Sequence, residues 1–145
     1  MIFLNSKSML KIEHIGIAVK SMDRSNELFT SLLGRAPYKQ EEAALDKVNT
    51  SFFDMNGTKV ELVAATDESS PIAKFIEKKG EGIHHIAFEV KDINESMQLL
   101  KLLGFQLIDQ VPRRGADNKM VCFLHPKSTN GVLVELCQSI VEEHA

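Results

Sequence analysis

The sequence contains an internal repeat, and this repeat constrains the fold more than any other feature. From His14 the chain reads His-Ile-Gly-Ile-Ala-Val-Lys, and from His85 it reads His-Ile-Ala-Phe-Glu-Val-Lys. Each stretch leads into a segment of helical apolar spacing that ends at a glycine, Gly34 or Gly104, 20 or 19 residues after its histidine. A fixed period with polar residues at matching points indicates two structurally equivalent units.

Both copies close on the same three residues, Val-Glu-Leu. The glutamates, Glu61 and Glu135, follow their histidines by 47 and 50 residues. At 145 residues the chain has the length of one domain. We therefore predict a single domain over residues 1–145, made of a first module (about 10–66), a helical connector (about 70–80) and a second module (about 82–138).

The repeat predicts the same order of elements, β-α-β-β-β, in both modules, and apolar periodicity places most of them. Alternating residues indicate strands, whereas a cap residue, a 3.6-residue spacing and a terminal glycine indicate helices. In the first module the expected elements are a strand 11–19, a helix 22–33 and strands 50–55 and 58–65. A connector helix begins after Ser70. In the second module they are a strand through His85, a helix 93–103 and strands 105–109, 119–125 and 131–138. The fold class is α+β, with the two modules forming a curved mixed sheet around a cleft.

Alternation along the strands places the two histidines on equivalent faces. His14 shares its face with the small residues Gly16 and Ala18, while the neighbouring isoleucines point the other way. In the second copy His85 shares its face with Ala87, and the adjacent His84 points to the opposite side. The repeat therefore pairs His14 with His85.

The paired histidines and glutamates predict a metal site formed by His14, Glu61, His85 and Glu135. Two buried carboxylates without a cation would repel each other, whereas one divalent ion would neutralise both. Nitrogen and oxygen donors without a thiolate suit Zn, Co, Mn, Ni or Fe(II), and they do not discriminate among these metals. Four protein ligands on an octahedral ion leave two positions for water or a chelating substrate, as in catalytic sites.

Composition excludes several other classes of protein. A net charge of −3 argues against nucleic acid or an anionic membrane as the main partner. No apolar run is long enough to span a bilayer, and residues 1–4 are too short for a signal-peptide core. Two cysteines alone do not make a disulfide framework, so we expect a reduced, cytoplasmic protein, with residues 1–8 as a loose extension.

Three longer phrases resemble the methylmalonyl-CoA epimerase family of the vicinal oxygen chelate superfamily. They are the run from His14 to Lys20, the run Ser70–Val90 with its Gly-Glu-Gly-Ile-His-His centre, and Phe123-Leu-His-Pro-Lys-Ser-Thr-Asn-Gly-Val-Leu-Val-Glu-Leu136. The similarity covers about residues 10–138. It implies a metal-dependent isomerase that removes and returns a proton on the carbon atom between a thioester and a carboxylate.

The resemblance also implies roles for individual residues. Glu135 matches the family's metal-ligand glutamate that transfers a proton. The family's second carboxylate falls on Leu45 in a gap-free alignment, so we predict its neighbour Asp46 as the second acid/base. The alternative is that Asp46, Glu41 and Glu42 form only a solvated charged loop.

An acyl-CoA substrate requires cationic contacts that a protein of net negative charge supplies only locally. The candidates for the CoA phosphates are Arg113, Arg114, Lys119 and Lys127. Either Ser128 or His125 is the candidate for the acyl carboxylate or thioester. Members of the superfamily commonly pair, so we expect a homodimer. The rival interpretations are a glyoxalase I-like lyase, whose typical arginine after the first histidine is missing, and a non-catalytic binding module.

Overall fold

A computed structural model describes residues 8–141 of the chain. The loose extension was expected over residues 1–8, and positions 1–7 of it lie outside the described residues. The described part forms two compact units, residues 14–84 and residues 8–13 with 85–141. The boundaries fall inside β1 (Met9–Ala18) and β5 (Gly82–Val90), immediately before His14 and immediately before His85.

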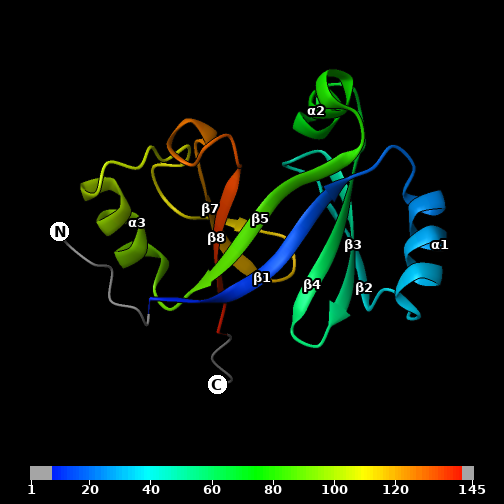
Figure 1. The fold of residues 1–145 in the computed structure, drawn as a ribbon, viewed down its shortest axis with the longest axis horizontal. Helices are drawn as coiled ribbons and strands as arrows, with labels where there is room; N and C mark the ends of the chain where they lie inside the picture. Colours follow the sequence, from blue (N-terminus) through cyan, green and yellow to red (C-terminus); the bar gives the residue numbers. More distant parts are fainter. Residues whose placement is uncertain (1–7, 142–145) are drawn as a thin grey trace. The chain divides into compact units, whose positions relative to one another are not determined.

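The unit of residues 14–84 contains a four-stranded mixed sheet and two helices (Figure 1). Its strands lie in the order β2-β3-β4-β1; β1 runs parallel to β4 and the other pairs are antiparallel. Besides β1, its elements are α1 (Met22–Leu33), β2 (Lys39–Ala43), β3 (Val48–Met55), β4 (Thr58–Ala65) and α2 (Pro71–Lys79).

Local sequence accounts for the ends of these elements. The Ser21 hydroxyl accepts a hydrogen bond from the Arg24 N–H at the start of α1, which ends at Gly34 in the left-handed conformation. Ser70 accepts from the Ile72 N–H, and Pro71 occupies the first turn of α2. The end of α1 at Gly34 and the start of α2 after Ser70 agree with the sequence prediction.

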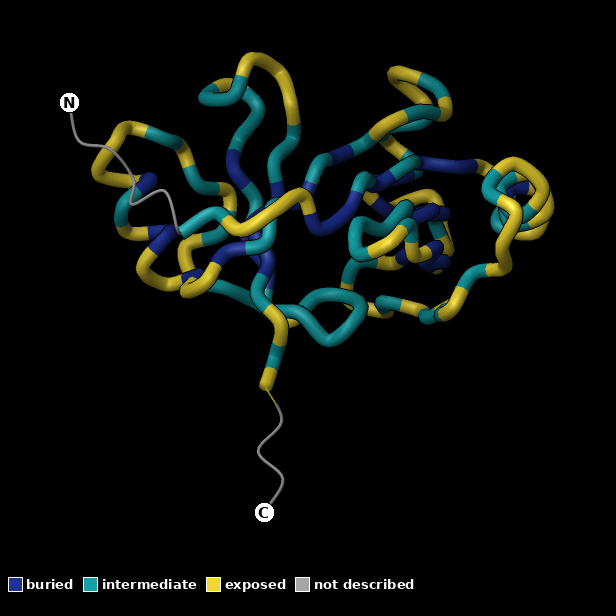
Figure 2. Tube along the Cα trace, turned by 60° about the horizontal axis from the view of Figure 1, so that its bottom comes forward, coloured by how far each residue is buried: buried dark blue, intermediate teal, exposed yellow. Residues whose placement is uncertain are grey.

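Two apolar clusters cover the two faces of this sheet. On one face Val19, Phe53 and Leu62 pack against α1, and on the other Ala18, Val48 and Val63 pack with Ile72 of α2. Within this sheet the longest buried stretches are residues 50–53 and 61–64; buried residues are dark blue along the tube of Figure 2. The alternation predicted for β1 is therefore confirmed: Val19 packs with α1, and Ala18 lies on the opposite face.

The unit of residues 8–13 and 85–141 repeats this topology. Its strands lie in the order β5-β8-β7-β6, with β5 parallel to β8 and the others antiparallel. Helix α3 (Ile93–Leu102) packs on this sheet through Ile93, Met97 and Leu100, which cluster with Val90 and Leu136. Besides β5, the elements are α3 (Ile93–Leu102), β6 (Arg113–Gly115), β7 (Lys119–Leu124), the 3₁₀ turn η1 (Pro126–Ser128) and β8 (Val134–Ser139).

Two differences from the predicted strands have physical causes. The polar segment Lys39–Ala43 forms the edge strand β2, because pairing with β3 satisfies its backbone although its side chains give no apolar alternation. The strand expected over residues 105–109 is reduced to an isolated bridge between Leu107 and Leu124, and the first strand after the helix is instead Arg113–Gly115, which the sequence did not predict. At the end of the segment 105–109, the Asp109 carboxylate, and not a backbone carbonyl, accepts a hydrogen bond from the Phe123 N–H at 2.8 Å.

The α+β class and the β-α-β-β-β repeat are confirmed. Among the described residues, no helix is long and apolar enough to cross a membrane.

Candidate active site

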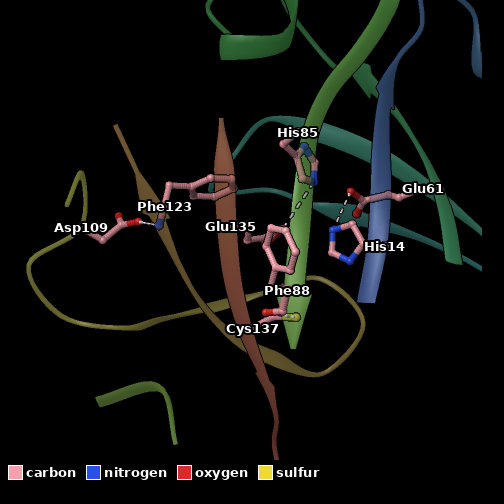
Figure 3. A network of polar contacts seen from close by, with 8 residues as sticks. All are labelled: His14, Glu61, His85, Phe88, Asp109, Phe123, Glu135 and Cys137. Atoms are coloured by element: carbon pink, nitrogen blue, oxygen red, sulfur yellow. Dashed lines mark hydrogen bonds and ion pairs between the residues drawn. The ribbon is translucent and has the colours of Figure 1, made fainter. Parts of the chain in front are cut away.

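The first histidine–glutamate pair lies on β1 and β4. Gly16 pairs with Glu61 in the parallel register, so His14 stands two residues before the partner of the glutamate and shares its face. His14 and Glu61 are 5% and 6% exposed. The His14 Nε2 lies 3.6 Å from the Glu61 Oε1 (Figure 3).

The second pair repeats this arrangement on β5 and β8. Ala87 pairs with Glu135, and His85 again stands two residues earlier. Both residues are 6% exposed, and the His85 Nε2 lies 3.3 Å from the Glu135 Oε2 (Figure 3). In both copies a residue with little or no side chain stands opposite the glutamate, which leaves space beside the strand for the histidine and glutamate side chains.

Each pair has the chemistry of half a metal site. A carboxylate removed from water needs a cation or several hydrogen bonds, and a neutral imidazole offers one lone pair. In each unit these donors stand within 3.6 Å of each other on the same sheet face. The donor set of each pair therefore fits a divalent metal ion that accepts nitrogen and oxygen ligands.

Both cysteines lie near Glu135 in the sheet: Cys137 is two residues beyond it on β8, and Cys122 of β7 pairs with Leu136. Burial, followed by the charges of Asp109 and Glu135, raises the pKa of Cys122 to about 12. Burial and the charges of Glu135 and Glu13 also raise the pKa of Cys137, whose Sγ donates to the Phe88 carbonyl at 3.6 Å. Both cysteines are therefore buried thiols in the sheet that carries Glu135.

Phe123 is a neighbour of His85 that the sequence did not indicate. Its ring meets the His85 ring edge to face, with centroids 5.8 Å apart and planes at 83°. Phe123 is also the cross-strand partner of Glu135. The antiparallel pairing of the two last strands could have suggested the second contact, but the contact with His85 depends on tertiary packing.

Asp46, the predicted second acid/base, lies half-buried in the turn between β2 and β3. On either side of this turn Ala43 pairs with Val48, and Val48 pairs with Ala65, four residues beyond Glu61 on β4. At about 3.3 Å per residue, the turn begins about 13 Å along the strand from Glu61. The apolar cluster of Val48 and Val63 occupies the sheet face between them.

Glu41 lies closer to Glu61 along the same sheet. It pairs with Thr50, and Thr50 pairs with Val63, two residues from the glutamate. Cross-strand partners and residues two apart share a face, so Glu41 is on the face of Glu61. Its Oε1 lies 3.7 Å from the Lys39 Nζ, and its side chain is about one-third exposed.

The predicted substrate contacts lie on β6 and η1. The Arg113 Nε donates to the Asp109 Oδ1 at 3.3 Å, and the exposed Arg114 donates to Asn118 at 2.9 Å. Lys127 is exposed at the middle of η1. Ser128 donates its hydroxyl to the His125 carbonyl at 3.0 Å.

Fold and site chemistry agree with a family assignment. Residues 13–123 match the model of the Glyoxalase/Bleomycin resistance protein/Dioxygenase superfamily, and the chain belongs to this superfamily.

Individual relatives make the resemblance more specific. The chain is 43% identical over 136 residues to the Bacillus subtilis protein YqjC, described as uncharacterized, covering 94% of this chain and 97% of that protein. It is 38% identical over 130 residues to the ethylmalonyl-CoA/methylmalonyl-CoA epimerase of Cereibacter sphaeroides, covering 88% and 97%.

A solved structure agrees with these sequence matches. The structure of methylmalonyl-CoA epimerase in complex with methylmalonyl-CoA and NH4+ superposes with a TM-score of 0.90 at 31% identity, covering 95% of this chain and 100% of that chain. The predicted resemblance to methylmalonyl-CoA epimerases is confirmed, and so is the expectation of an enzyme.

Proposed function

We propose that this chain is a metal-dependent epimerase that interconverts the (R) and (S) forms of methylmalonyl-CoA. The observation that carries the proposal is the equivalence of two buried histidine–glutamate pairs, at the same register in both copies of the repeat. Relatives named as epimerases of this substrate supply the reaction class.

His14, Glu61, His85 and Glu135 would together hold one divalent ion. Cobalt, zinc, manganese and nickel all accept this donor set. When bound, the ion supplies Lewis acidity that stabilises the enolate oxygen of the substrate and so makes the C2 proton easier to remove.

The carboxylates of the chain carry the proton. Glu135 is buried, and its Oε2 lies 3.3 Å from the His85 Nε2, so it has few orientations available and little water around it. Such a carboxylate can take the C2 proton from one face, while an acid on the other face returns a proton. Inversion at C2 therefore needs a second acid/base group on that other face.

Asp46 is the predicted second acid/base, and Glu41 is the alternative that its position on the Glu61 face favours. Asp46→Asn and Glu41→Gln are matched variants, because each replaces a carboxylate by its isosteric amide on or beside the same strand. The variant of the true acid/base retains binding of the acyl-CoA and loses epimerisation by about 10²–10⁴-fold. The other variant retains activity.

The CoA moiety would be bound by Arg113, Arg114 and Lys127, with Ser128 near the acyl group. Cationic side chains pair with phosphates through charge-assisted hydrogen bonds. Arg114→Gln is the first variant to measure, because the Arg114 side chain is exposed. We expect this variant to have a higher KM with unchanged kcat.

We further propose that the chain works as a single domain in a cytoplasmic homodimer.

Isotope exchange tests the function. The metal-loaded protein is incubated with methylmalonyl-CoA in deuterated water, and deuterium at C2 is measured by mass spectrometry. We expect exchange that His85→Ala abolishes and His84→Ala preserves, since His84 packs against Phe75. Absence of exchange in the unmodified protein, or turnover of a glutathione hemithioacetal instead, would overturn the proposal in favour of a binding module or a glyoxalase I-like lyase.

A further inference from the structure

The His85 imidazole is backed by a stack of side chains from its own unit. The Phe123 ring meets His85 edge to face at 5.8 Å. The guanidinium carbon of Arg113 lies 5.6 Å from the centre of the Phe123 ring. The phenyl ring is therefore in contact with the histidine and with a cation.

Asp109 ties the other members of this stack together. One carboxylate oxygen accepts the Phe123 N–H at 2.8 Å (Figure 3), and the other accepts the Arg113 Nε at 3.3 Å. The Asp109 side chain is 18% exposed, so water screens the ion pair less than it would at an open surface. One carboxylate thus fixes the backbone that carries the ring and the cation that lies over the ring.

Such a stack restricts how the imidazole can turn. An edge-to-face ring pair has a preferred geometry, and a cation above the phenyl face adds a contact that holds the phenyl ring. Phe123 also stands opposite Glu135 in the β7–β8 register and shares its face. The ring therefore bounds the space in which His85 and Glu135 meet.

We infer that Phe123, held by Arg113 and Asp109, is a positioning residue that presents the His85 Nε2 to the metal ion. The inference rests on the proposed function only in taking His85 as a metal ligand. Fixing the ring in advance lowers the entropy lost when an ion binds, as partners behind a ligand do in other metal sites.

A second stack in the chain provides the control. Phe75 meets His84 edge to face at 4.9 Å and 85°, and the Lys79 Nζ lies 5.8 Å from the centre of the Phe75 ring. The chemistry is the same, but His84 is not a proposed ligand. Phe75→Leu therefore removes the same kind of contact without touching the site.

The experiment compares Phe123→Leu with Phe75→Leu in the full chain. In the metal-free protein, NMR should detect NOEs between the rings of Phe123 and His85, and the His85 ring resonances should shift in Phe123→Leu only. Titration with Co²⁺ should give about three- to tenfold weaker binding and an altered visible spectrum for Phe123→Leu, the range expected for one edge-to-face pair. Phe75→Leu should bind Co²⁺ like the unmodified protein.

Arg113→Gln gives an independent test if Phe123→Leu does not fold, because Arg113 is partly exposed. We expect about two- to threefold weaker Co²⁺ binding, measured without CoA so that a phosphate contact plays no part. Unchanged His85 resonances and unchanged Co²⁺ affinity in these variants would overturn the inference while leaving the epimerase proposal intact. Absence of C2 exchange in the unmodified protein would instead overturn the function, and the NMR comparison would still decide the inference.

Discussion

A bound divalent ion should stabilise the folded protein by an amount that depends on all four proposed ligands. An ion that binds only the folded state at 100 times its Kd adds about 2.7 kcal/mol to the free energy of unfolding. For 145 residues the entropy of unfolding is about 0.3 kcal/mol/K, so the melting temperature should rise by about 9 °C over the metal-free protein.

Replacing one ligand should remove most of this gain. His85 is only 6% exposed and its Nε2 faces Glu135, so no water-exposed side chain can take its place easily. If His85→Ala weakens binding by about a hundredfold, the gain at the same ion concentration falls to about 0.4 kcal/mol, or about 1 °C.

Differential scanning calorimetry with Co²⁺ or Zn²⁺, after treatment with a chelator, measures both shifts. His84→Ala is the matched control, because it removes the neighbouring imidazole and should keep the full shift. A full shift in His85→Ala, or no shift in the unmodified protein, would refute the assignment of these ligands.

Three further predictions concern the fold that carries the site. Phe53→Ala should lower the free energy of unfolding by about 3–5 kcal/mol in urea titrations, because Phe53 is fully buried, whereas Leu45→Ala, at a side chain 96% exposed, should change it by less than about 0.5 kcal/mol. Ser70→Ala should cost about 1 kcal/mol in the same assay, since the buried hydroxyl caps α2; no change would remove the capping role. Cys122, whose pKa is raised to about 12, should resist iodoacetamide at pH 8 until the chain unfolds. The free energy of unfolding should fall as the pH rises above 9, because the Cys122 thiol then loses its proton in the unfolded chain but keeps it in the folded protein.

The repeat and the period-two alternation were sufficient to predict most of the fold. They predicted that His14 and the apolar residues of the first strand lie on opposite faces. The structure confirms this, because Val19, on the face opposite to His14, packs with α1. They also matched the two histidines with each other and the two glutamates with each other. In each unit the structure places one histidine within 3.6 Å of one glutamate, and all four residues are buried. Local patterns were sufficient here because neighbouring residues determine on which face of a strand a side chain lies and which residue caps a helix.

Tertiary packing determined what the sequence could not indicate. β2 has no apolar alternation, and only its pairing with β3 reveals it as a strand. The separation between Asp46 and Glu61 follows from the register of three strands, so an alignment without gaps does not measure it. The contact of Phe123 with His85 joins residues on different strands and has no sequence signature.

The measurement that tests the central claim most directly is the number of metal ions that one chain binds and the identity of the ligands. Calorimetric titration with Co²⁺ gives the stoichiometry, and X-ray absorption counts the imidazoles on the metal. We predict one ion per chain with two imidazole ligands, and loss of tight binding when either His14 or His85 is replaced by alanine. Two ions per chain, or one ion that both variants still bind tightly, would contradict the shared site.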